Sequence, residues 1–92
     1  MKIIWTATAI KQERALENYL LNHWSSEILR NYQNKLESKL QLLSLYPEAG
    51  VVIKEDYRRI NVTPQSALIY RIVRGDLVII LMLWDNRQKP IW

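Results

Sequence analysis

The apolar run from Leu77 to Trp84 limits the folds open to this chain more than any other segment. Its near-continuous apolar character predicts a strand covered on both faces, and it falls far short of the ~20 residues that a membrane span needs. A polar sequence follows at once, formed by Asp85, Asn86, Arg87 and Gln88. Because polar groups at the end of a buried strand often form a functional site, this segment is the first candidate site.

The first half of the chain predicts a short strand and two helices. Lys2 to Trp5 is β-like, and Thr6 or Thr8 can cap the first helix, which ends near Trp24. Ser25 and Ser26 separate it from a second helix. That helix carries a stripe of apolar residues at helical spacing: Leu29, Tyr32, Leu36, Leu40 and Leu43. The two helices should form an antiparallel hairpin.

The second half predicts strands joined by tight turns. Pro47 and Gly50 end the second helix. Strands are expected over Arg58–Val62, with an earlier start near Val51 left open, and over 67–73 and 77–84. The order β-αα-βββ predicts an α+β fold, a small antiparallel sheet with the helical hairpin packed on one face. We expect the leucine stripe to contact sheet residues such as Ile69 and Leu81.

The length and composition of the chain exclude several kinds of functional site. A chain of 92 residues predicts one domain spanning 1–92. It has no cysteine and one histidine, His23, so we expect no disulfide, no metal site and no cofactor. The N-terminus does not resemble a signal peptide, which predicts a cytoplasmic protein. The net charge of +4 is compatible with binding to nucleic acid, to the ribosome or to an acidic partner.

Four segments together carry a family resemblance. They are Ile4-Trp5-Thr6 with Ala9, the helix stop from Leu43 to Gly50, the central strands from Tyr57 to Arg71, and the closing Trp84 to Pro90. In this order and at this chain length they resemble RelE/ParE-type toxins of bacterial type II toxin–antitoxin pairs. The resemblance implies the β-αα-βββ fold, a cognate antitoxin that neutralises the toxin, and a toxin–antitoxin hetero-oligomer.

The same resemblance implies two alternative targets. ParE-like members bind DNA gyrase and block it, whereas RelE-like members cleave mRNA on the ribosome. Arg58 and Arg87 fall on cationic positions of the RelE-like catalytic set, but Ile60 and Ala67 replace two others, and no tyrosine or histidine follows Arg87. The incomplete set favours a growth inhibitor acting on gyrase. A ribosome-dependent mRNA endoribonuclease and an inactive binding module with a toxin fold remain as alternatives, so enzymatic activity stays open.

Further residues are expected to contact partners. The candidates for target binding are Arg59, Arg71, Asp85, Asn86 and Gln88. Trp24 at the helix junction and Trp92 at the end of the chain are candidates for antitoxin binding. The plainer reading makes the arginines ordinary solvated or paired strand residues and 85–88 a polar turn. The sequence leaves these readings open.

Overall fold

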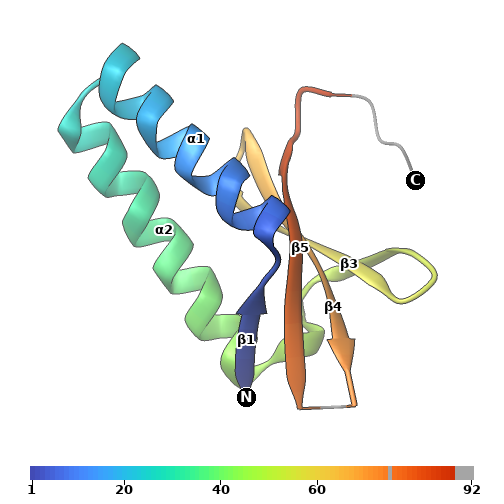
Figure 1. Ribbon diagram of the computed structural model, residues 1–92. Helices are drawn as coiled ribbons and strands as arrows, with labels where there is room; N and C mark the ends of the chain where they lie inside the picture. The colour runs from blue at the N-terminus through green and yellow to red at the C-terminus, as the bar shows by residue number, and fades with distance from the viewer. Residues whose placement is uncertain (75, 89–92) are drawn as a thin grey trace.

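The computed structural model describes residues 1–74 and 76–88. Within them the chain folds, in order, into β1 (Lys2–Trp5), α1 (Ala7–His23), α2 (Ser26–Leu45), a short 3-10 helix η1 (Pro47–Ala49), β2 (Val51–Lys54), β3 (Tyr57–Thr63), β4 (Ser66–Val73) and β5 (Leu77–Asp85). The two helices lie side by side and cover one face of the five-stranded sheet (Figure 1). This arrangement confirms the predicted α+β class with a helical hairpin on one face of a small sheet.

Both helices begin at a hydroxyl side chain. The Thr6 Oγ1 accepts a hydrogen bond from the Ala9 backbone N–H at 3.1 Å, so Thr6 rather than Thr8 is the cap of α1. Ser25 caps α2 in the same way, accepting from the Ile28 N–H at 3.1 Å. The Thr6 hydroxyl also donates to the Leu81 carbonyl at 2.9 Å. One residue therefore starts α1 and ties that helix to the middle of β5.

The sheet is mixed rather than wholly antiparallel as predicted. Its strand order is β1-β5-β4-β3-β2, and β5 runs antiparallel to β4 but parallel to β1. Parallel neighbours need a long connection, which the two helices and the three strands between β1 and β5 provide. The β1 pairing stops at Ile80, and beyond it the Gln12 side chain of α1 accepts the Leu83 N–H at 2.8 Å. A helix side chain thus replaces the missing strand at this edge.

The core lies between the helices and one face of the sheet. Leu36 and Leu43 of α2 are buried there, with Leu29 and Leu40 partly buried beside them, as the predicted stripe requires. The sheet residues of this core are Ile60, Val62, Leu68, Tyr70, Val78 and Ile80. The expectation that the stripe packs on Ile69 is wrong: Ile69 alternates with Leu68 and Tyr70 and therefore points to the other face. Leu81 is skipped by the β4–β5 pairing, because Ile69 pairs with Met82 and Tyr70 with Ile80.

A separate edge strand precedes β3. Val51–Lys54 forms β2, where the sequence left the start of the first central strand open. The turn before it is held by the Tyr70 hydroxyl, which donates to the Pro47 carbonyl at 2.6 Å and accepts from the Gly50 N–H at 2.8 Å. A Cβ on Gly50 would stand 2.6 Å from that hydroxyl oxygen, so the contact requires glycine. Neither α1 nor α2 is long and apolar enough to cross a membrane.

Candidate functional site

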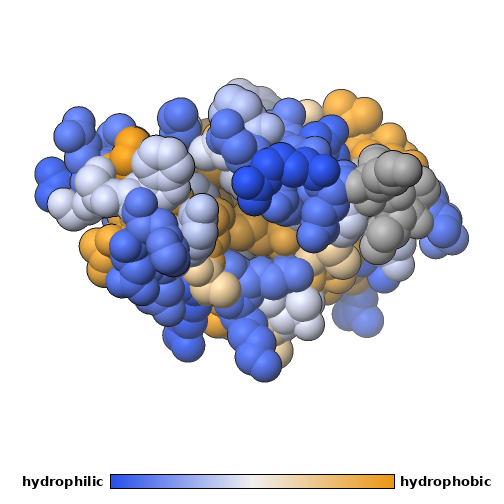
Figure 2. Space-filling view, turned by 90° about the horizontal axis from the view of Figure 1, so that it is seen from above, coloured by the Kyte–Doolittle hydropathy of each residue, from blue (hydrophilic) through white to orange (hydrophobic). Residues whose placement is uncertain are grey.

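A groove opens where the α1–α2 turn faces one end of the sheet. It encloses about 800 Å³ between the two helices, the turn joining β3 to β4, and the end of β5. Its inner wall is apolar, formed by Leu16, Leu20, Tyr32 and Leu83. Figure 2, which views this end from above, shows apolar side chains in a recess flanked by hydrophilic ones. We call this space the end groove.

Trp24 stands at the rim of the end groove. This residue is 66% exposed, although a tryptophan usually buries most of its surface. Ile28 lies on the same rim and is 41% exposed. Lys35 adds positive charge at the opening, whereas the charge of Arg87 is paired with that of Asp85 in the same lining. The groove therefore offers an apolar interior and a partly basic rim.

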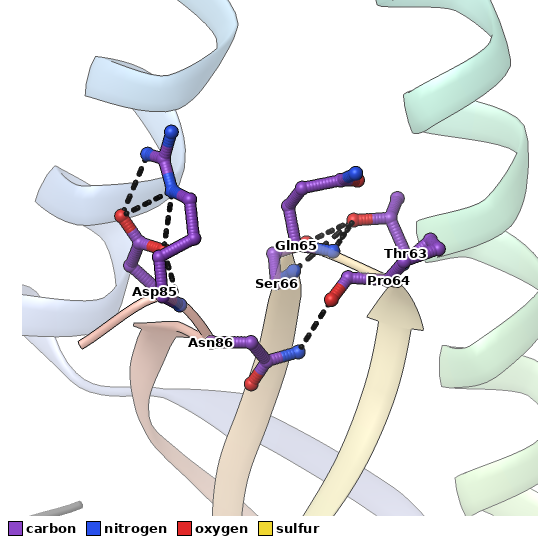
Figure 3. A network of polar contacts seen from close by, with 7 residues as sticks. Thr63, Pro64, Gln65, Ser66, Asp85 and Asn86 are labelled. Atoms are coloured by element: carbon purple, nitrogen blue, oxygen red, sulfur yellow. Dashed lines mark hydrogen bonds and ion pairs between the residues drawn. The ribbon is translucent and has the colours of Figure 1, made fainter. Parts of the chain in front are cut away.

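The sheet side of the end groove is held by a polar network (Figure 3). The Asn86 N–H donates to the Gln65 carbonyl at 2.8 Å, and the Asn86 side-chain amide donates to the Pro64 carbonyl at 3.2 Å. The Thr63 hydroxyl accepts the Gln65 and Ser66 N–H groups at 3.2 and 3.1 Å. These bonds join the end of β5 to the β3–β4 turn.

Asp85 and Arg87 form a local ion pair at the same corner. The Arg87 Nη2 lies 2.7 Å from the Asp85 Oδ2, and the Arg87 Nε and backbone N–H both donate to Asp85 Oδ1 at 2.9 Å. These bonds from Arg87 lower the pKa of the Asp85 carboxyl to about 2. The Arg87 side chain is 76% exposed, so the pair lies in solvent.

The sheet face opposite the helices carries two arginines. Alternation along β3 and β4 places Tyr57, Arg59, Asn61, Ile69 and Arg71 on it, and we call these five residues the arginine face. The Arg71 Nη2 lies 2.8 Å from Asp56 Oδ2, and its guanidinium carbon is 5.9 Å from the Tyr57 ring centre. The Nε–H groups of both arginines are buried without a hydrogen-bond partner in the described part of the chain. Because these two Nε–H groups have almost no accessible surface, a ligand reaches them only after neighbouring side chains move.

The sequence model of one family, described as the ParE toxin of the parDE type II toxin–antitoxin system, matches residues 3–90. The chain belongs to the ParE toxin family. It is therefore a type II toxin, and the family implies an antitoxin partner. The resemblance found in the sequence is confirmed. No curated protein sequence matches this toxin.

Solved structures share the fold of this toxin at low identity. A chain of the chromosomal ParDE system from P. aeruginosa is 16% identical with a TM-score of 0.74, and the alignment covers 92% of this chain and 95% of that one. The YoeB/ParE toxin from Agrobacterium tumefaciens is 15% identical with a TM-score of 0.67, covering 94% and 99%. YafQ from E. coli is 16% identical with a TM-score of 0.66, covering 94% and 93%.

The structure separates the two residues predicted to be catalytic. Arg58 lies near the start of β3, where its Nη1 donates to the carbonyls of Gly50 and Glu48 at 2.9 and 3.2 Å. Arg87 follows the end of β5, beside the turn that ends β3. The bonds of Arg58 stabilise the turn before β2. The two guanidinium groups therefore do not converge on one site.

The other candidates divide between the two surfaces. Arg59 and Arg71 lie on the arginine face, and Asp85 and Trp24 line the end groove. Asn86 lies between these surfaces, because its side chain also accepts from the Arg59 Nη2 at 2.8 Å. Gln88 is exposed just beyond the corner. Trp92 lies outside the described residues.

Sequence reasoning missed two members of the arginine face. Tyr57 lies under the Arg71 guanidinium, and Asn61 accepts a hydrogen bond from the Asn86 amide at 3.1 Å. The signal was available in the spacing, since 57, 59 and 61 alternate onto the face that carries Arg59. What the spacing lacked was the pairing with β4, which places Arg71 opposite Tyr57.

Proposed function

We propose that this toxin arrests growth by binding DNA gyrase through the arginine face, without hydrolysing a substrate. The supporting observation is the chemistry of that face. Its five residues present guanidinium donors and no histidine, and arginine stays protonated and transfers protons poorly. The nearest lysine, Lys54, pairs with Tyr57 from the edge strand β2 at the border of the face. The nearby carboxylates Asp56 and Asp85 are both ion-paired. This arrangement suits the recognition of an anionic surface better than acid–base catalysis.

We also propose that residues 1–92 act as one toxin domain. This toxin acts in the cytoplasm, where gyrase and the ribosome are found, and its antitoxin binds it in a hetero-oligomer. The match to the ParE family over residues 3–90 supports the gyrase target over the ribosomal one.

An mRNA endoribonuclease is the second candidate. Two observations favour it: the guanidinium groups of Arg59 and Arg71 share one sheet face, which suits a phosphate, and the phenol of Tyr57 lies beneath Arg71. A phenol at this position can supply a proton to a leaving oxygen, which the arginines cannot. Tyr57 is therefore the residue whose replacement separates the two functions.

Induced expression without antitoxin tests the target. We expect growth arrest with filamentation, and we expect the purified toxin to block gyrase supercoiling in vitro. Tyr57→Phe should keep that inhibition within about twofold, since a hydroxyl outside a buried network contributes little. Ribosome-dependent mRNA cleavage that Tyr57→Phe abolishes would instead establish the endoribonuclease. Normal growth despite abundant folded protein would contradict both toxic functions and favour an inactive binding module.

The end groove is the proposed antitoxin site. An amphipathic helix or strand of the antitoxin would place apolar residues against Leu16, Leu20 and Leu83, and an acidic residue near Lys35. The net charge of +4 favours an acidic partner. The exposed Trp24 is the side chain that such a segment would cover.

Trp24→Ala should weaken antitoxin binding by roughly 30-fold, or about 2 kcal/mol, the usual loss for a buried aromatic anchor. The matched control is Tyr46→Ala, which removes an aromatic that is 64% exposed but does not line the groove. Calorimetric titration with purified antitoxin measures the affinity of each variant. Equal affinities for the two variants would show that the antitoxin binds elsewhere.

A further inference from the structure

The side chain of Asn86 uses its polar atoms within the toxin. Its Nδ2 donates to the Asn61 Oδ1 at 3.1 Å and to the Pro64 carbonyl at 3.2 Å. Its Oδ1 accepts from the Arg59 Nη2 at 2.8 Å. The amide orientation is determined by these partners, because a carbonyl only accepts and a guanidinium only donates. Both amide hydrogens are thus occupied, which leaves Asn86 no side-chain donor for a target.

The backbone around Asn86 is held as firmly as its side chain. The Asn86 N–H donates to the Gln65 carbonyl at 2.8 Å, and Asp85 pairs with Ser66 in the sheet. Figure 3 shows the Asn86 amide pointing at the Pro64 carbonyl, across the gap between the end of β5 and the β3–β4 turn. Asn86 is therefore a rigid acceptor for Arg59.

The hydrogen bond to Asn86 fixes the orientation of the Arg59 guanidinium. An arginine side chain has several rotatable bonds, and immobilising it normally opposes binding. The charge-assisted bond to Asn86 holds one end of the guanidinium. The Nε–H is buried without a partner among the described residues, while Arg59 as a whole stays partly exposed on the arginine face.

We propose that Asn86 is a positioning residue, which holds the Arg59 guanidinium in its target-binding orientation rather than contacting the target. This inference rests on the proposed function, because it takes the arginine face as the target surface. Asn86 belongs at the same time to the corner beside the end groove, so one side chain connects the wall of that groove to Arg59.

Nuclear magnetic resonance of the arginine side chain tests the positioning without reference to toxicity. In the unaltered toxin, rotation about the Nε–Cζ bond of Arg59 should be slow enough to resolve separate Nη signals. Asn86→Ala should merge them, whereas Asn86→Asp, which keeps an oxygen acceptor, should leave them separate. Asn61→Ala is the control, since it removes a partner of Asn86 but not the bond to Arg59. Merged signals in the unaltered toxin, or separate ones in Asn86→Ala, would overturn the positioning.

Gyrase inhibition then tests whether the positioning serves binding. Arg59→Ala should raise the half-inhibitory concentration roughly 10- to 100-fold, and Asn86→Ala roughly three- to tenfold, corrected for the folded fraction. Asn86→Asp should retain most of the gyrase inhibition that Asn86→Ala loses. The double variant should match Arg59→Ala alone, because Asn86 has nothing left to position. Additive losses would make Asn86 an independent contact. Full inhibition by Arg59→Ala would overturn the proposed target surface, while the resonance experiment still reports on the Arg59–Asn86 bond.

Discussion

Leu43→Ala should lower the free energy of unfolding by about 2–5 kcal/mol, a large part of the stability of a domain this small. Leu43 is 0% exposed and packs in the core between α2 and the sheet. Its truncation removes apolar contacts and leaves a cavity that the surrounding strands cannot fill completely. The melting temperature should fall by at least about 8 °C.

Leu45→Ala is a closely matched control for this variant. Leu45 lies two residues further along the same helix and is 72% exposed. The side-chain truncation is the same, and because Leu45 is the last residue of α2 its replacement changes helix propensity even less, so the main difference is burial. Leu45→Ala should change the unfolding free energy by no more than about 0.5 kcal/mol. Similar losses in the two variants, measured by urea unfolding, would mean that the buried face of α2 is misassigned.

Glu13→Gln should stabilise the toxin above pH 7 and flatten its stability profile at lower pH. Burial, together with the hydrogen bond and negative charge of Glu17, raises the pKa of Glu13 from its ordinary 4.5 to about 7, and the positive charge of Arg14 opposes this rise. The Glu13 Oε2 and the Tyr32 hydroxyl are both buried without a partner in the described chain. The same burial and the two carboxylates also raise the pKa of Tyr32.

The direction of the pH effect follows from the raised pKa of Glu13. The folded state holds the proton more tightly than the unfolded state, so this contribution to stability is complete below pH 4.5 and disappears as the pH rises to about 7. After allowance for the solvent that reaches a half-buried carboxyl, we expect a loss of about 1 kcal/mol. Urea unfolding at pH 4.5 to 8 measures it.

Glu17→Gln supplies the comparison for the Glu13 titration. It removes the neighbouring charge but leaves Glu13 in place, so the midpoint of the pH dependence should move down without vanishing. Asp85 does not interfere with this measurement. Because its pKa is lowered, its contribution to the unfolding free energy disappears only as the pH falls from 3.8 to about 2. A pH profile that Glu13→Gln leaves unchanged would assign the titration to another group.

Features that depend on near neighbours in the chain could be predicted from the sequence. The cap at Ser25, the stripe ending at Leu43, and the strands near Tyr57, Ala67 and Leu77 all follow from spacing and turn chemistry over a few residues. Observed boundaries differ by one residue where a strand extends into its turn, as at Asp85. The family could also be recognised, because its motifs are local segments in a constant order.

Tertiary structure alone decided which distant segments meet. The sequence placed Ile69 toward the helices and Asn86 toward a target, but register puts Ile69 on the opposite face and the bonds to Arg59 and Pro64 occupy Asn86. Strand side chains alternate, so a shift of one residue reverses every such assignment. The raised pKa of Glu13 likewise follows from burial that exists only in the folded structure. Local sequence thus determined which helices and strands form, whereas long-range pairing determined the partners of their polar side chains.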